Sequence, residues 1–356
     1  MRHAARLAVL AALATPALAA PPDKLTNARV ETRSAMAGLS RAVQEALEGR
    51  SGPAWIGWSV PATSEGSSCC WRDDGGDRRC GCRLEGREGW TGTYEGDDSE
   101  ALEPSGRMRM LLRASAGRVG RVRWFSEACP LDAGGLPFVW IDDVRPSESV
   151  ALLLTLVGEP KDGAREGKLL DGAVIGAVAA HGDPSADAAL DRLVAPGQPS
   201  KTRKEAAFWL GQARGPHGYE VLKRLVRDDA DARFREHAIF ALTQSREPGA
   251  VDTILQVAKR DPDGHVRGQA LFWLAQTAAR RASEAIRSAI DDDPEVEVKK
   301  KAVFALSQLP KDEGVPLLIG VAKTHKSYEV RKQAMFWLGQ SRDPRALAFF
   351  EDVLKN

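Results

Sequence analysis

The sequence predicts a mostly helical fold, an α-solenoid preceded by a small α+β domain, and two observations carry this prediction. Residues of one type recur every 32 positions in the second half of the chain, which is the pattern of a repeated pair of helices. All five cysteines and six of the nine tryptophans lie before residue 141, so the two halves differ in composition. We therefore expect a leader at 1–19, a small domain at 20–146 and the solenoid at 147–356.

The first residues, MRHAARLAVLAALATPALAA, have the pattern of a secretory signal peptide. Arg2 and Arg6 precede an apolar run too short to span a bilayer comfortably, and Ala17-Leu18-Ala19 fits a small-x-small cleavage site. No other stretch approaches the apolar length of a membrane span. We expect cleavage after Ala19 and a periplasmic or secreted protein with no membrane span.

The charge balance argues against a nucleic-acid partner. The chain has 50 basic and 49 acidic residues, and loss of the two leader arginines leaves 48 basic residues and a net charge of −1. A nucleic-acid-binding domain normally carries a basic surface, which neither this balance nor an exported location supplies.

The segment 20–146 reads as one helix followed by short strands. Leu25, Met36, Leu39, Val43 and Leu47 have the spacing of one helical face. Strand-forming residues then alternate in AWIGWSV, RMRMLLRA, GRVRWF and LPFVWIDDV, which turn-forming residues separate. The sequence RPSES near residue 146 places a proline and a serine N-cap at the start of the next helix.

Each repeat after this boundary predicts two helices. The first helix carries an apolar pair three residues apart, and the second carries a Phe four residues before a Gln. The leading residues of the apolar pairs are Leu190, Leu222, Ile254, Ile286, Leu318 and Phe350. The Phe and Gln series is Phe208, Gln212, Phe240, Gln244, Phe272, Gln276, Phe304, Gln308, Phe336 and Gln340.

The repeats resemble HEAT repeats, especially the short bacterial kind that is also found in bilin lyases. DPDGHVRGQALFWLAQ at 261–276 and SYEVRKQAMFWLGQSRDPRAL at 327–347 carry the resemblance, through the order Asp, Val-Arg, Ala and Leu-Gly. The resemblance implies that the second helices line a concave face, with the Phe and Gln series along it. It says little about chemistry, since this superfamily includes scaffolds, transport receptors and a few enzymes.

Two interpretations of the Phe and Gln series stay open. In one, the series is a ladder that binds an extended peptide, as armadillo arrays do with Trp and Asn at the same spacing. In the other, it serves stacking between repeats, because runs such as AMFWL are apolar all round the helix and Gln can bond to carbonyls at the helix end.

Two further series keep the period of 32. Trp209, Ala241, Trp273, Ala305 and Trp337 alternate a large ring with a methyl group, which predicts interdigitation of neighbouring repeats. The basic residues Arg203, Arg235, Arg267, Lys299 and Arg331 predict an internal polar ladder, with Asp229, Asp261 and Asp293 six residues ahead of three of them. The last helix, PRALAFFEDVLKN, is expected to cap the array.

The cysteines predict disulfides. Cys69, Cys70, Cys80 and Cys82 form a CC-x9-CxC pattern, and Cys129 stands alone. A zinc site is the alternative, but its usual C-x2-4-C spacing is absent and an exported protein meets an oxidising compartment. Cys129 either joins this loop to the sheet, freeing one of the four, or is itself free.

No catalytic constellation is visible, since the histidines are scattered and the sequence has no H-E-x-x-H, G-x-S-x-G or P-loop. We therefore expect a non-enzymatic exported scaffold without a cofactor, whose partner is a protein or an extended peptide. The alternative is an enzyme, or a metal- or redox-dependent sensor, with a site at the Cys loop and first repeats. The oligomeric state does not follow from the sequence.

Overall fold

The computed structural model describes residues 23–63, 69–73, 78–80, 82–85, 91–92, 106–159 and 170–355. The expected leader lies outside these residues. No helix in the described part of the chain is long and apolar enough to cross a membrane.

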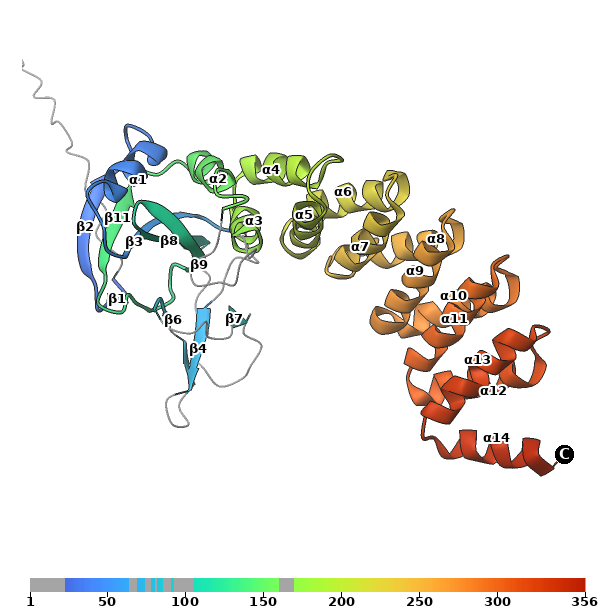
Figure 1. Cartoon of the computed structure of the whole chain (residues 1–356). Coiled ribbons are helices and arrows are strands. Elements are labelled where there is room, and N and C mark those ends of the chain that lie inside the picture. Colours follow the sequence, from blue (N-terminus) through green and yellow to red (C-terminus); the bar gives the residue numbers. More distant parts are fainter. Residues whose placement is uncertain are drawn as a thin grey trace, which may run out of the picture.

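The N-terminal domain is built on a five-stranded mixed sheet in the order β2-β11-β3-β8-β9 (Figure 1). β11 runs parallel to both of its neighbours, and β3, β8 and β9 are antiparallel. The bounds are β2 Arg29–Ser34, β3 Ala54–Pro61, β8 Arg107–Ser115, β9 Arg118–Ser126 and β11 Pro137–Asp142, with helix α1 at Leu39–Leu47. The last four strands confirm the strands predicted from alternation.

The long helix expected around Leu25 to Leu47 is wrong in its first half. Residues 25–26 form strand β1 and residues 29–34 form β2, and only Leu39–Leu47 is helical. β2 pairs in parallel with β11 over its whole length, so the backbone is satisfied by a partner more than 100 residues away. Local apolar spacing does not reveal such a pairing.

The central strands separate two cores because alternate side chains point to opposite faces. Ile56 and Trp58 of β3 face α1 and the helical array, whereas Trp55 faces a smaller core that contains three cysteines. Two small sheets lie on that side, β1-β10-β6 and β5-β4-β7. Their bounds are β1 Leu25–Thr26, β4 Cys69–Asp73, β5 Arg78–Cys80, β6 Cys82–Arg83, β7 Thr91–Gly92 and β10 Leu131–Asp132.

The helical array follows as thirteen helices in the described part of the chain. α2 begins at Pro146 itself, with Arg145 at the N-cap and no side-chain cap, so the expected serine cap is wrong. Five complete pairs, α4/α5 to α12/α13, keep the period of 32, α2 and α3 precede them, and α14 follows. The bounds are α2 Pro146–Leu154, α3 Asp171–Ala180, α4 Pro184–Val194, α5 Ser200–Ala213, α6 Gly215–Asp228, α7 Ala232–Thr243, α8 Ala250–Arg260, α9 Gly264–Thr277, α10 Ala279–Asp292, α11 Val296–Gln308, α12 Lys311–Thr324, α13 Tyr328–Gln340 and α14 Pro344–Lys355.

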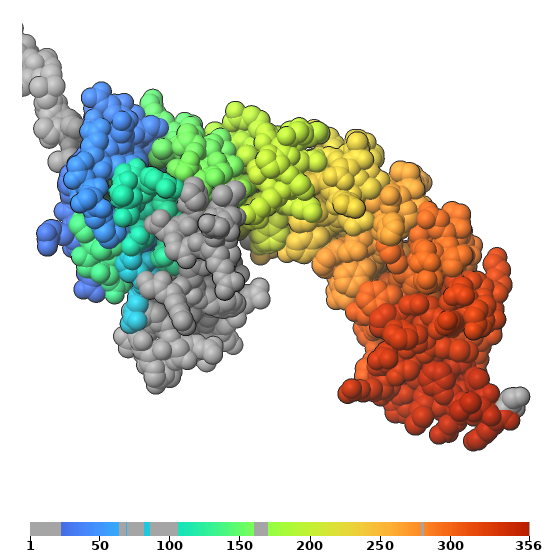
Figure 2. All heavy atoms as spheres, in the orientation of Figure 1, coloured from blue at the N-terminus to red at the C-terminus, as the bar shows by residue number. Residues whose placement is uncertain are grey.

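The array is an arc with two layers. The second helices pack directly on one another from α5 to α13, whereas neighbouring first helices are more splayed. Figure 1 shows α5, α7, α9 and α11 on the inner side of the arc, and the space-filling view in Figure 2 shows the same curvature. The prediction of an α-solenoid after a small α+β domain is confirmed.

The last helix, α14, leaves part of its apolar surface exposed. α14 buries Ala346 and Phe349, but Leu347 is 62% exposed and Leu354 is 86% exposed. α14 occupies the place of a first helix, and within the described residues no second helix follows to cover its outer apolar positions.

Candidate functional site: the aromatic ridge

The five Phe residues of the repeats lie on the inner helices and are only partly covered. Phe208, Phe240, Phe272 and Phe304 are half-buried, and Phe336 is 54% exposed. Neighbouring residues on the same helices, such as Ala334 and Leu338, are fully buried. The Phe rings therefore stand at the boundary between the packed interior and the inner surface of the arc.

The rings form one continuous chain of contacts, which we call the aromatic ridge. Phe208 stacks on Phe240 with ring centroids 6.1 Å apart, and Phe272 stacks on Phe304 at 5.7 Å. Between these pairs, Trp273 contacts both Phe240 at 5.0 Å and Phe272 at 5.1 Å. At the end, Trp337 links Phe304 and Phe336. Adjacent aromatic rings at 4.5–7 Å attract each other beyond the burial of their area.

The alternation of Trp and Ala has a clear role in this chain of rings. Trp273 and Trp337 each reach back to the Phe of the preceding repeat, and that Phe is followed by Ala in its own helix. A Trp in every repeat would place two large rings at one junction. The unit of the ridge is therefore two repeats, or 64 residues.

The ridge continues into the N-terminal domain. Trp209 contacts Trp124 of β9 with ring centroids 5.9 Å apart. Gly176 of α3 makes room for both, since a Cβ there would lie 2.6 Å from Trp209 and 2.7 Å from Trp124. Gly176 occupies the position that Phe holds in later repeats, and the sequence alone did not connect it with Trp124.

The Gln side chains flank the ridge one helical turn further on. Gln276 donates to Gln308 across one repeat at 3.1 Å. Gln244 and Gln308 donate to the hydroxyl groups of Thr243 and Ser307, at 2.9 and 3.0 Å. Gln212 is half-buried and Gln340 is exposed. The expected bond from Gln to a helix-end carbonyl is not found among the described contacts.

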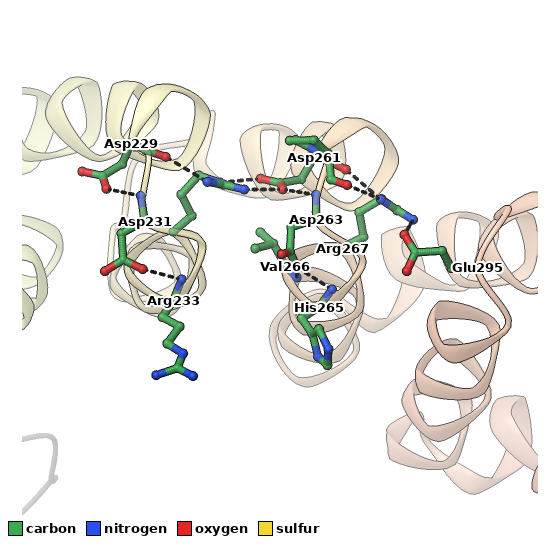
Figure 3. Close-up of polar contacts among 11 residues, drawn as sticks. Asp229, Asp231, Arg233, Asp261, Asp263, His265, Val266, Arg267 and Glu295 are labelled. Carbon is green, nitrogen blue, oxygen red and sulfur yellow. Dashed lines mark hydrogen bonds and ion pairs between the residues drawn. The ribbon is translucent and has the colours of Figure 1, made fainter.

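A row of buried ion pairs joins consecutive repeats (Figure 3). Each Arg binds the carboxylate of an Asp that lies 26 residues later, in the next repeat. Arg235 donates from Nε and Nη2 to Asp261 at 2.8 Å each, which raises the pKa of the guanidinium. The pairs are Arg203 with Asp229, Arg235 with Asp261, and Arg267 with Asp293.

For Arg235 and Arg267, the Asp six residues earlier contributes its main-chain carbonyl. Arg235 donates to the carbonyl of Asp229 at 2.9 Å, and Arg267 donates to that of Asp261 at 2.8 Å. The Asp261 carboxylate also accepts from the N–H of Asp263, which in turn caps α9. The predicted polar ladder is present, but its ion pairs lie between repeats and hold neighbouring repeats in register.

The row of ion pairs ends where a His replaces the fourth Asp of the series. His325 stands 32 residues after Asp293, and the matching basic residue is Lys299. Lys299 donates to the carbonyl of Ile290 at 2.9 Å, and His325 Nε2 lies 3.1 Å from the same oxygen. At this junction, the side chains of Lys299 and His325 thus bind main-chain carbonyl groups in place of an Arg–Asp ion pair.

Three cysteines, Cys69, Cys82 and Cys129, converge in the smaller core, and all three are in disulfides. Cys69 is disulfide-bonded to Cys129, which joins the cysteine segment to the chain beyond β9. Cys82 is also in a disulfide, and its sulfur lies 3.8 Å from that of Cys129. The disulfide prediction is confirmed for these three. The alternative zinc site needs thiolates, which bonded sulfurs do not supply. The side chains of Cys70 and Cys80 lie outside the described part of the structure.

A Ser and a His meet at the junction between the sheet and the array. Trp58 Nε1 donates to Ser149 Oγ at 2.8 Å, Ser149 Oγ lies 2.8 Å from His181 Nε2, and His181 Nδ1 lies 2.7 Å from the carbonyl of Ala177. A neutral imidazole with its proton on Nδ1 satisfies every group. Ser149 and His181 are fully buried, so this pair connects β3, α2 and α3 and is closed to a substrate.

The buried imidazole predicts a pH-dependent stability. Burial lowers the pKa of His181 to about 4, from an ordinary value of 6.5. Protonation therefore favours the unfolded chain, so this stability is complete above pH 6.5 and is lost as the pH falls toward 4. We expect the free energy of unfolding to drop between pH 7 and 4.5 by about 2 kcal/mol more in the wild type than in His181→Asn. Urea titrations at both pH values measure this, and an equal drop in the two proteins contradicts it.

The fold and the inner stripe of rings define an α-solenoid protein, and comparison with known families agrees. A family model of HEAT repeats matches residues 186–275 and 283–356, which confirms the predicted resemblance to HEAT repeats. No curated protein matches the chain.

Solved structures with a similar arrangement are distant. The complex of CpcE and CpcF of phycocyanin lyase from Nostoc sp. PCC7120 is 24% identical, covering 44% of this chain and 99% of that chain, with a TM-score of 0.33. A designed armadillo repeat protein in complex with the peptide (KR)4 is 17% identical, covering 56% and 100%, with a TM-score of 0.29. Human deoxyhypusine hydroxylase is 18% identical, covering 58% and 90%, with a TM-score of 0.29.

Proposed function

We propose that this protein is an exported, non-enzymatic scaffold that holds an extended segment of a partner protein or peptide along the aromatic ridge. The observation that carries the proposal is the continuity of half-exposed rings on the inner layer, from Trp209 to Phe336. Stacking between repeats uses one side of these rings, and the exposed remainder is a narrow apolar strip bordered by amides. In this proposal, stacking between repeats uses one face of each Phe ring, and peptide binding uses the other.

The spacing of the ridge suits an extended chain. Side chains on one face of an extended peptide repeat every ~6.6 Å. The stacked rings of neighbouring repeats lie 6.1 Å apart for Phe208 and Phe240 and 5.7 Å apart for Phe272 and Phe304, so two such side chains of a peptide can contact the two rings of one stacked pair. The amides of Gln212 and Gln340 supply donors and acceptors for peptide main chain at the border of the strip.

A display experiment tests this function. A library of random 12-residue peptides is selected on the immobilised mature protein, and the binding of a selected peptide is measured by calorimetry. We expect Phe272→Ser to weaken binding at least tenfold, because the ring loses its stacking and apolar surface. Arg287→Ser, an exposed change on the outer helix α10, serves as the control.

The same measurement decides against the proposal when Phe272→Ser binds the peptide as well as the wild type does. Thermal unfolding of each variant checks that the ridge variant remains folded at the assay temperature. Trp273→Ala, at the neighbouring ring that joins two stacked pairs, is expected to be the less stable of the two.

A further inference from the structure

A small pocket lies beside the last part of the ridge, where α11, α12 and α13 meet. Its volume is about 200 Å³, and its walls include Gln308, Trp337 and Gln340 of the inner helices. Val315 and Leu318 of α12 close it on the apolar side. The pocket is therefore reached from the border of the ridge and has space for the end of a peptide or a single side chain.

Trp337, a wall residue of this pocket, has an unused donor. Its Nε1 is buried and has no hydrogen-bond partner among the described residues. Trp209, at the same place four repeats earlier, donates its Nε1 to Glu205 at 3.2 Å. The residue that corresponds to Glu205 is Gln333, so the indole of Trp337 lacks this acidic partner. A buried N–H without a partner is costly and favours a ligand that accepts from it.

Two hydroxyl groups of the pocket wall already donate their protons within the protein. Ser307 and Ser341 already donate to the carbonyls of Phe304 and Leu338, at 2.7 Å each. Those hydroxyl protons are thus unavailable to a ligand bound in the pocket.

Two further wall residues, Lys311 and Gln340, have no side-chain hydrogen bond among the described contacts, and no wall residue is acidic. A positive charge, an indole N–H and an amide together suit an acceptor that is negatively charged.

We propose that this pocket binds a carboxylate of the peptide that occupies the ridge, a step that rests on the proposed function. Trp337 Nε1 donates to one carboxylate oxygen, Gln340 and Lys311 engage the other, and Val315 and Leu318 contact the attached aliphatic carbons. The carboxylate belongs either to the C-terminal residue or to an acidic side chain, and these two sources differ only in what is attached to the group.

Indole resonances test the pocket directly. The mature protein is labelled with ¹⁵N at its tryptophan indoles, and the signal of Trp337 is assigned by its absence in Trp337→Phe, which keeps a ring on Phe304. N-acetylalanine presents a terminal carboxylate, N-acetylaspartic acid amide presents a side-chain carboxylate, and N-acetylalanine amide presents neither.

We expect one of the two acids to shift the Trp337 signal saturably, at least tenfold more tightly than the neutral amide does, while the Trp273 signal stays in place. The tighter acid identifies the source of the carboxylate. Lys311→Met, an exposed change, is expected to weaken this binding about tenfold. An absent shift, or equal binding of the neutral amide, overturns the proposal.

The two proposals fail separately. A shift of Trp337 by an acid, together with peptide binding that Phe272→Ser leaves unchanged, retains the pocket and rejects the ridge as the peptide site. Peptide binding that depends on Phe272, without any shift of Trp337 by the acids, retains the ridge and rejects the pocket.

Discussion

Gly211→Ala is expected to destabilise the protein by about 3 kcal/mol, although alanine is the better helix former by roughly 1 kcal/mol. A Cβ at residue 211 of α5 would lie 2.1 Å from the carbonyl oxygen of Ala241 in α7. The obstacle is main chain, so no rotamer change relieves it, and α7 must move away from α5. Chemical denaturation of the wild type and the variant measures the difference.

Gly339→Ala is the matched control for that change. Gly339 stands at the same repeat position in α13, 128 residues later, and a Cβ there meets no atom within 4 Å. We expect Gly339→Ala to be neutral or to stabilise the protein by up to about 1 kcal/mol. If the two substitutions change the free energy of unfolding equally, the close approach of α7 to α5 is not the cause of the loss at Gly211.

Asp261→Ala is expected to destabilise the protein by about 3 to 5 kcal/mol. It leaves the guanidinium of Arg235 buried without its carboxylate, and loss of one partner of a buried pair has a cost of this size. The variant also removes the acceptor for the N–H of Asp263 at the entry to α9. Calorimetric or denaturant unfolding measures the loss.

Asp293→Ala tests whether the unpaired charge is the cause. Arg267 has a second carboxylate, since its Nη2 also donates to Glu295 at 2.9 Å. The charge of Arg267 therefore keeps a partner after Asp293 is removed, and we expect a loss of stability that is smaller by at least 1 kcal/mol. A larger loss for Asp293→Ala than for Asp261→Ala contradicts this account of the row.

Residue spacing alone did not predict which cysteines are bonded to each other. Five cysteines at an unusual spacing indicated disulfides but allowed several connectivities. The structure pairs Cys69 with Cys129 because β4 and the segment after β9 meet in the smaller core, where both side chains are buried. Sixty residues separate the two, so their meeting depends on how the sheets pack.

The sequence by itself determined the helical array, because a period of 32 residues repeats the same local preferences and each repeat buries its apolar positions only against its neighbours. The same period identified the Phe and Trp residues of the ridge and the basic series. Only the tertiary structure decided which groups meet across repeats. Arg235, for example, binds the carboxylate of Asp261 in the following repeat, and this contact depends on how far one repeat lies from the next. The strand at Arg29–Ser34 likewise exists through its pairing with β11, a contact that local sequence does not encode.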